Sequence, residues 1–180
     1  MYDRSEEPIK DSRVIITDNI GSDIRDKLSF IIDNYDNLPE VAVYSKANIF
    51  KYINEEEFEK IKNNKTFTPV LTKHHKTYSD NNGVVCFYDE NGMYNERNDY
   101  FYLLSHPCKT INACNELKAM FKMDEREFNA FAPGSNYIVP RENILKHPKE
   151  FYEKLRGYLE WAVYPGEAQI IERNLYYIWK

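Results

Sequence analysis

"RVIITDNIGSDIRDKLSFIIDNYDNLPEVAVYS" (13–45) is the stretch of the sequence that decides the fold class. It begins with apolar, β-branched residues bounded by polar ones, a pattern typical of a short buried strand over 13–19. Apolar side chains then recur at helical spacing over 22–38, and a second apolar run follows over 41–45. The order strand, helix, strand predicts a βαβ unit with a parallel pairing.

The ends of this first helix are marked by residues that suit a start and a stop. Ser22 is a good N-cap with Arg25 at the third helical position, and Pro39 closes the helix. A second helix should begin after Asn54. The first turn of this helix is acidic, which suits the helix dipole. Proline has no backbone N–H to donate to a β-sheet, so the segment around Pro69 should be irregular or a short edge strand.

The rest of the chain continues the alternation of strands and helices. The patterns predict strands over 83–89 and 136–140, helices over 112–123, 149–162 and 167–179, a helical turn at 141–145, and a loop-rich stretch over 90–110. There is no repeat and no low-complexity linker. The sequence therefore predicts one domain over 1–180, an α/β fold with a mixed, mostly parallel sheet flanked by helices.

Charge and composition exclude several classes of protein. The chain has 24 Lys and Arg against 29 Asp and Glu, a net charge of −5, which argues against nucleic-acid binding. The basic cluster at 73–76 reads as a solvated loop. No apolar run reaches the ~18 residues of a membrane span, and the charged start lacks the apolar core of a signal peptide. We expect a cytoplasmic protein without a transmembrane segment.

The three cysteines, Cys86, Cys108 and Cys114, follow no metal-binding spacing. Their number is odd, and there is no Cys-x-x-Cys pair. This pattern predicts reduced thiols rather than a disulfide framework or a structural zinc site.

Two segments that follow predicted strands are candidates for binding an anionic ligand, because ligands of open α/β sheets lie beyond the strand ends. In "TDNIGS" (17–22), Gly21 and a helix N-terminus offer backbone N–H groups to an anion, and Arg25 lies one turn further on. In "YSKANIF" (44–50), Lys46 can neutralise a phosphate. An ordinary strand-to-helix turn and a solvated loop are the alternatives.

The last helix carries the candidate acids. Glu167 in "PGE" (165–167) lies in a first turn, where a carboxylate can act as a general base or simply cap the helix. Glu172 and Arg173 follow on the same helix, where an Arg–carboxylate pair could brace the fold.

Three motifs resemble an uncharacterised glycosyltransferase-like family found in bacteria, fungi and large viruses. "IGSDIRDKLSFIIDNYDNLPEVAVYSKANIF" is similar to its Gly-Arg-Glu helix start, "IIxNYDNLPD" and following strand. "FAPGSNYIVPRENILKHPKEFYEKL" is similar to its "PGAxFxVSRExIxxxPxxFYxxL", and "GEAQIIERNLYYIW" to its closing "xExxxxERxWxxIF" helix. The resemblance covers about residues 13–179 and is weak over 60–110.

The resemblance implies a glycosyltransferase-A-like fold and transfer of a sugar from a nucleotide-sugar donor. The positions that match its motifs are Gly21, Asn34, Tyr35, Asp36, Asn37, Asn48, Pro133, Gly134, Arg141, Glu167, Glu172 and Arg173. The turn "SKAN" departs from the family's acid-bearing turn, so no metal ligand is assigned and Mn²⁺ or Mg²⁺ is left open. The family's first strand–helix unit, which commonly holds the nucleotide base, is expected to be missing ahead of the chain.

Two functions follow as hypotheses. The first is a glycosyltransferase acting on a glycan or polysaccharide hydroxyl, with Glu167 and Glu172 as candidate catalytic acids. Its donor would be bound by Gly21, Arg25, Lys46, Asn48, Gly134, Arg141 and Arg173. The alternative is a non-catalytic carbohydrate- or protein-binding domain on a degenerate or truncated transferase fold, in which Tyr44, Tyr137 and Tyr164 would stack on sugars.

Overall fold

The computed structural model describes the whole chain apart from residues 72–77, 80–84, 89–92, 98–105 and 127. Its helices are α1 (Ser22–Asp33), α2 (Glu55–Ile61), α3 (Ile111–Met120), α4 (Arg141–Ile144), α5 (Lys149–Gly157) and α6 (Gly166–Trp179). Its strands are β1 (Tyr2–Asp3), β2 (Ile15–Ile16), β3 (Val41–Tyr44), β4 (Thr68–Pro69), β5 (Tyr78–Ser79), β6 (Val85–Tyr88), β7 (Tyr94–Arg97), β8 (Phe128–Phe131) and β9 (Tyr137–Pro140). The chain is therefore a mixed α/β protein, as predicted.

The sheets are small and mostly antiparallel, so the expectation of a mostly parallel sheet is wrong. Strands β3, β9 and β4 form one sheet with β9 in the middle, and β5 to β8 form a second sheet in chain order; all of their pairs are antiparallel. Within the described residues only β1 and β2 pair in parallel. The βαβ unit does not form, because β3 takes β9 as its partner instead of the strand before α1.

The predicted strand over 13–19 shrinks to the two residues of β2. Both of its side chains are exposed, Ile15 at 52 % and Ile16 at 69 %, so the apolar run is not buried. A short apolar run shows a preference for extended backbone but does not say whether another element covers it.

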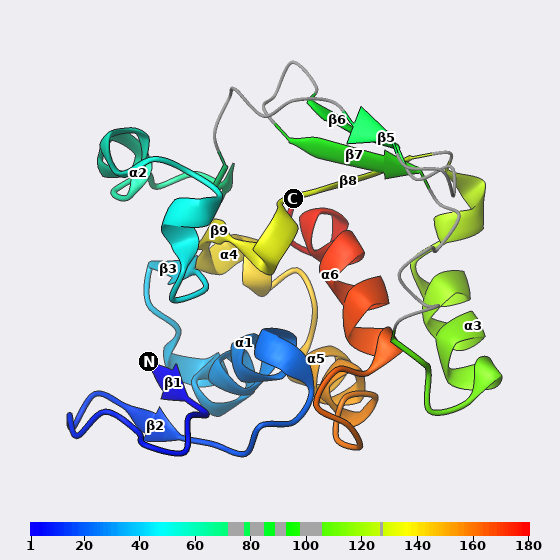
Figure 1. The fold of residues 1–180 in the computed structure, drawn as a ribbon, viewed down its shortest axis with the longest axis horizontal. Helices are drawn as coiled ribbons and strands as arrows, with labels where there is room; N and C mark the ends of the chain where they lie inside the picture. The colour runs from blue at the N-terminus through cyan, green and yellow to red at the C-terminus, as the bar shows by residue number, and fades with distance from the viewer. Residues whose placement is uncertain (72–77, 80–84, 89–92, 98–105, 127) are drawn as a thin grey trace.

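Helix α6 lies at the centre of the molecule. Figure 1 shows it between the β5–β8 sheet on one side and helices α1 and α5 on the other. Its last turn carries Trp179, which is fully buried and stacks on Tyr44 with ring centroids 5.1 Å apart. Tyr137 of β9 meets the same indole edge-on at 5.5 Å. The core therefore joins α6 to the middle sheet through aromatic contacts.

Most of the predicted helices are confirmed. Helix α2 begins after Asn54, whose side chain accepts the backbone N–H of Glu57. Helix α5 ends five residues before the predicted end at 162, whereas α4 and α6 lie where the patterns placed them. β8 and β7 were not predicted, and the basic cluster at 73–76 lies outside the described residues.

The cysteine prediction needs a correction. The structure joins Cys108 and Cys114 in a disulfide, with their Cα atoms 6.0 Å apart. Cys108 precedes α3 and Cys114 lies in its first turn, so helix geometry brings the pair together without any Cys-x-x-Cys spacing.

No helix in the described part of the chain combines the length and the apolar character needed to span a membrane.

Candidate functional site

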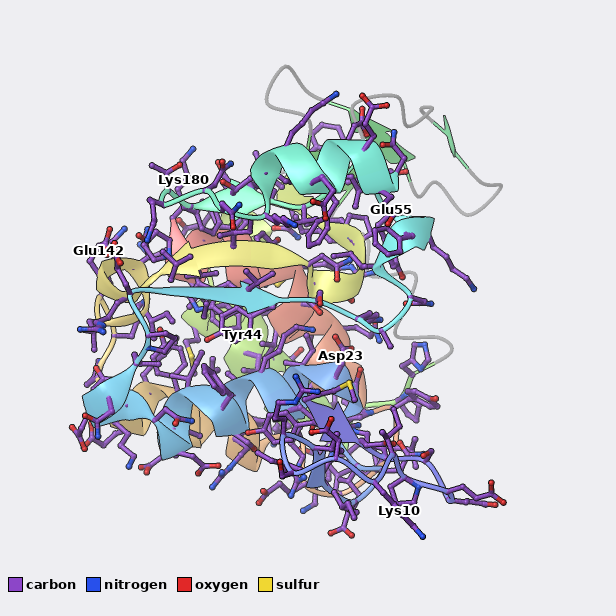
Figure 2. The ribbon with its side chains drawn as sticks, turned by 90° about the vertical axis from the view of Figure 1, so that its left-hand side faces the viewer. Lys10, Asp23, Tyr44, Glu55, Glu142 and Lys180 are labelled. Atoms are coloured by element: carbon purple, nitrogen blue, oxygen red, sulfur yellow. A yellow bond between two sulfur atoms is a disulfide. The ribbon has the colours of Figure 1, made fainter. Side chains whose placement is uncertain are left out.

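A cavity of about 740 Å³ lies between the N-terminal residues 1–4, one face of α1 and residues 39–47 of the β3 segment. β3 is an edge strand of its sheet, so its free edge forms one wall of this cavity. Figure 2 shows β3 lying between α1 and α2, with Asp23 near the end of β3 that carries Tyr44. The polar groups described next lie at that end.

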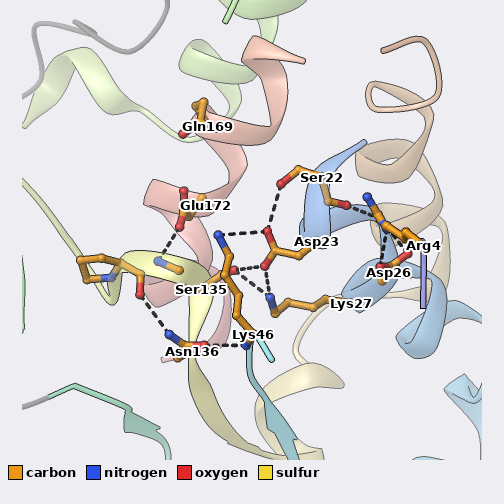
Figure 3. A network of polar contacts seen from close by, with 12 residues as sticks. Arg4, Ser22, Asp23, Asp26, Lys27, Lys46, Ser135, Asn136, Gln169 and Glu172 are labelled. Atoms are coloured by element: carbon orange, nitrogen blue, oxygen red, sulfur yellow. Dashed lines mark hydrogen bonds and ion pairs between the residues drawn. The ribbon is translucent and has the colours of Figure 1, made fainter. Parts of the chain in front are cut away.

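Four side chains, which we call the Asp23 cluster, connect α1, the end of β3 and the turn before β9: Asp23, Lys27, Lys46 and Ser135 (Figure 3). Asp23 Oδ2 accepts hydrogen bonds from Lys27 Nζ and, at 2.7 Å, from Ser135 Oγ. Lys27 Nζ also lies 2.8 Å from Ser135 Oγ. Lys46 Nζ lies 3.5 Å from Asp23 Oδ1, so two ammonium groups share one carboxylate.

The cluster carries one positive charge in excess, and Lys46 is its most exposed member. Burial opposes the ionisation of Asp23, but Lys27 and Lys46 outweigh it and hold the pKa of that carboxyl well below its usual range. Burial likewise opposes the charge on Lys46, yet Asp23 and Glu172 raise the pKa of its amine. The Lys46 side chain is 32 % exposed and that of Lys27 only 7 %, so Lys46 is the cation that can reach a ligand.

Local sequence explains why these groups meet. Asp23 and Lys27 are four residues apart on α1 and therefore lie on the same face of the helix. Ser135 belongs to the turn Pro133–Ser135, in which Gly134 has φ +78° and Ser135 has φ +54°. These left-handed conformations turn the Ser135 hydroxyl toward α1.

The same turn fixes the backbone of Lys46 and the position of Glu172. Asn136 Oδ1 accepts the backbone N–H of Lys46 at 2.9 Å, and Asn136 Nδ2 donates to Pro133 O. Gly134 N donates to Glu172 Oε1 at 2.8 Å. The other oxygen of Glu172 lies 3.7 Å from Arg173, in the bracing pair that the sequence indicated. Glu172 is therefore held beside the cluster by the backbone.

A separate ion pair lines the cavity. Arg4 Nε donates to Asp26 at 2.8 Å, and the Arg4 guanidinium also donates to Ser22 O. Both side chains are less than one-fifth exposed. Because Arg4 and Asp26 neutralise each other, the pair leaves the excess charge of the Asp23 cluster unchanged.

Gly21 and Arg25 do not form the anion site that was expected. The backbone N–H groups of Gly21 and Ser22 donate to Ala162 O at 2.7 Å and Val163 O at 2.9 Å, so they are not available to a ligand. Gly21 is itself the N-cap, with φ +74°, and Ser22 makes no capping bond. The Arg25 guanidinium lies against Thr17 and Glu160, away from the Asp23 cluster.

Glu167 is placed as a structural residue rather than an accessible base. Its side chain has no exposed surface. Its oxygens accept the backbone N–H of Lys109 at 2.8 Å and Trp161 Nε1 at 3.3 Å. Of the two candidate general bases, Glu172 is therefore the one that remains.

Four other residues proposed to bind the donor either lie away from the Asp23 cluster or have a structural role. Arg141 follows the end of β9 that pairs with Val41, whereas Lys46 lies beyond the opposite end of β3. Asn48 is exposed and begins the short helical turn Ile49–Lys51. A Cβ on Gly134 would lie 2.8 Å from the Tyr52 ring, so this glycine makes room for Tyr52. Arg173 lies on α6, where it is buried, donates to Gln169 O of the same helix and faces the ring of Phe131.

The aromatic residues proposed to stack on sugars are mostly in the core. Tyr44 and Tyr137 are 6 % and 0 % exposed. Tyr164 is 60 % exposed and lies beside the ring of His106. Of these three residues, Tyr164 is thus the one that can stack on a ligand.

Sequence reasoning found Lys46 and Glu172 but missed Asp23, Lys27 and Ser135. The spacing of Asp23 and Lys27 was available as a signal, since an acid and a lysine four residues apart interact on a helix. Ser135 lies more than one hundred residues from Lys27, and no local pattern predicts their contact.

The chain matches the family described as "Protein of unknown function (DUF3431)" over residues 2–180 and belongs to that family. No curated protein and no solved structure matches it.

Proposed function

We propose that the chain is a glycosyltransferase on a glycosyltransferase-A-like fold, transferring a sugar from a nucleotide-sugar to a glycan or polysaccharide hydroxyl. The observation that carries the proposal is the excess cation at the end of the cavity, where Lys27 and Lys46 share Asp23. A donor offers a diphosphate to Lys46 and a nucleoside of a size that suits about 740 Å³. The three sequence motifs described above add support.

In the proposed reaction the acceptor oxygen attacks the anomeric carbon of the donor sugar. The bond from that carbon to the diphosphate breaks, and the nucleoside diphosphate leaves with the electron pair. Lys46 stabilises the charge that develops on the leaving group. Glu172, beside the cluster, takes the proton of the acceptor hydroxyl. Asp23 and Asn136 hold Lys46 in place from its two ends.

The residues around Lys46 do not fit a divalent metal. Mn²⁺ and Mg²⁺ need carboxylate oxygens, and the carboxylate of Asp23 is already shared by two lysines. In this proposal the ammonium of Lys46 supplies the charge that a metal would otherwise bring.

We propose that the transferase acts in the cytoplasm.

The proposal is tested by binding and turnover of nucleotide-sugars. A thermal-shift screen of nucleoside diphosphates and nucleotide-sugars, with and without Mn²⁺, should find one donor that stabilises the protein. A ligand at about 100 times its Kd adds roughly 2.7 kcal/mol of stability. Lys46→Ala should abolish that shift, whereas Lys60→Ala on the exposed face of α2 should preserve it.

Glu172→Gln separates chemistry from binding. It should keep the donor shift and lower turnover by about 10²- to 10⁴-fold, the usual contribution of a general base. If no nucleotide shifts the melting temperature of well-folded protein, the transferase proposal fails.

One observation favours the alternative of a non-catalytic carbohydrate- or protein-binding domain. Glu172 is only 13 % exposed with one oxygen already bonded, and Glu167 is fully buried. A binding domain should bind a glycan through exposed groups such as Tyr164 without turning over any donor. Glycan binding that is lost in Tyr164→Ala, together with an unaltered melting temperature in every nucleotide, would select this alternative.

A further inference from the structure

A second group of reactive side chains lies at the start of α6. The sulfurs of Cys108 and Cys114 and a carboxylate oxygen of Glu167 all lie within 4.8 Å of one another. Within the described ranges, this is the one group of three Cys, His, Asp or Glu side chains with metal-ligand spacing. The three residues come from the connection before α3, the first turn of α3 and the first turn of α6.

Glu167 is a buried acid without a cation. No described residue forms a salt bridge with it, and its two bonded partners are the neutral N–H groups of Lys109 and Trp161. A buried carboxylate is costly unless it is paired or binds a metal. Each of its oxygens accepts one bond and keeps a lone pair for a further ligand.

The main chain holds the cysteines beside this acid. Gly166 N donates to Pro107 O at 2.9 Å, and a Cβ on Gly166 would lie 2.3 Å from His106 O. The segment before α3 therefore packs directly on the start of α6. Thr110 caps α3 by accepting the N–H of Ala113, which fixes the turn that carries Cys114. The backbone around both cysteines is therefore held by contacts other than the disulfide.

We propose that Cys108, Cys114 and Glu167 bind one Zn²⁺ when the disulfide is reduced. A dithiol reductant passes two electrons and two protons to the disulfide, which opens to two thiols while the reductant closes its own disulfide. Zn²⁺ then displaces the two thiol protons and takes two thiolates, one carboxylate oxygen and a water in four-coordinate geometry. Thiolate ligands select zinc over Mg²⁺ or Ca²⁺.

The partly exposed side of Cys108 gives the ion and its water access to the site. A reducing compartment such as the cytoplasm favours the thiolate form, and oxidation returns the disulfide and releases the ion. The zinc site does not rest on the proposed transferase reaction, since none of its three residues belongs to the Asp23 cluster.

The test compares oxidised and reduced wild-type protein in a chelator-competition titration with Zn²⁺. Reduced protein should bind one Zn²⁺ per chain, and oxidised protein none. Co²⁺ in place of Zn²⁺ should give thiolate-to-metal charge-transfer absorption in the reduced protein alone. This comparison needs no variant and so does not depend on any substitution being tolerated.

Variants then assign the ligands. Trp161→Phe removes one donor to Glu167 and should weaken Zn²⁺ binding by roughly 10- to 100-fold, the usual effect of losing a residue that supports a ligand. Cys114→Ser and Glu167→Gln each remove a ligand and should weaken Zn²⁺ binding by more than this. Cys86→Ser on β6 should leave the affinity unchanged. Reduced wild-type protein that binds no Zn²⁺, or affinity that survives Cys114→Ser in folded protein, overturns the proposal.

Discussion

Asp23 is the residue that sets the charge at the end of the cavity. It accepts bonds from Lys27 and Ser135, is 27 % exposed, and lies 3.5 Å from Lys46. Without it, Lys27 would be a buried ammonium left with one hydroxyl partner. Asp23 therefore stabilises the fold and restrains the cation that we propose binds the donor.

Replacing this carboxylate should cost stability in a pH-dependent way. Asp23→Asn should lower the free energy of unfolding at pH 7 by about 1.5–3 kcal/mol, the range for hydrogen bonds to charged groups. Because the pKa of Asp23 is lowered on folding, its stabilisation is complete above the usual aspartate pKa of about 3.9 and is lost as the pH falls below that value.

Urea titrations of both proteins between pH 7 and pH 3 measure this difference, which should shrink on acidification. Asp33→Asn, at the exposed end of the same helix, serves as the control and should stay within about 0.5 kcal/mol of wild type. A difference that stays constant with pH would mean that the charge of Asp23 is not what stabilises the fold.

Among single residues, those whose role is local were predictable from sequence. Asn54 caps α2 as expected, because its partner lies three residues away. Ser22 is not the cap that was expected, because Gly21 occupies the N-cap position and Ser22 is the first residue of the helix. Glu167 was recognised as a first-turn acid, but its burial depends on a segment before α3 that helix patterns do not place.

At the scale of elements, the turn Pro133–Ser135 connects β8, β9, α1 and α6. Gly134 should not tolerate a side chain, because its φ is +78° and a Cβ would lie 2.8 Å from Tyr52. We expect Gly134→Ala to destabilise the protein by about 1–3 kcal/mol. The same substitution at Gly157, whose Cβ would meet nothing within 4 Å, should be neutral or stabilise by roughly 0.4–1 kcal/mol.

Thermal or urea unfolding of the two glycine variants checks this prediction side by side. Because Gly134 N also donates to Glu172, Gly134→Ala should also turn over the donor of the wild-type enzyme more slowly. Equal stability of the two variants would show that the turn is not constrained as described.

Helices were easier to predict than strands for a physical reason. Helix α5 shows its apolar spacing within its own sequence, because Tyr152 and Leu155 lie three residues apart on the face that it buries. A strand of two to four residues, such as β2 or β4, carries too few positions for a period to show. Its partner also lies elsewhere in the chain, so the parallel pairing predicted for 41–45 had no local support.

At the scale of the whole molecule, one aromatic-rich core joins α1, α5 and α6 to β3, β8 and β9. Trp179 lies within it, fully buried between Tyr44 and Tyr137. We expect a single cooperative transition, in which tryptophan fluorescence and far-ultraviolet circular dichroism report the same urea midpoint. Two separate midpoints would mean that the N-terminal part and α6 unfold independently.

The overall class, a mixed α/β chain, could be read from the alternation of patterns. The topology could not, because α1 contacts α5 and β3 contacts β9 across long stretches of sequence. The cavity depends on that topology, since its walls are residues 1–4, α1 and the free edge of β3. Lys46 could thus be proposed as a cation near a strand end without its partner being known.

The pairing of β3 with β9 has a consequence for synthesis of the protein on the ribosome. β3 leaves the exit tunnel well before β9 and the Trp179 indole, which pack against Tyr44 in the folded protein. Until then the apolar faces of α1 and β3 lack the partners that β9 and α6 supply, and long-range pairing of this kind is slow to form. The nascent chain should therefore be a client of ribosome-associated chaperones while the segment between β3 and α6 is being made.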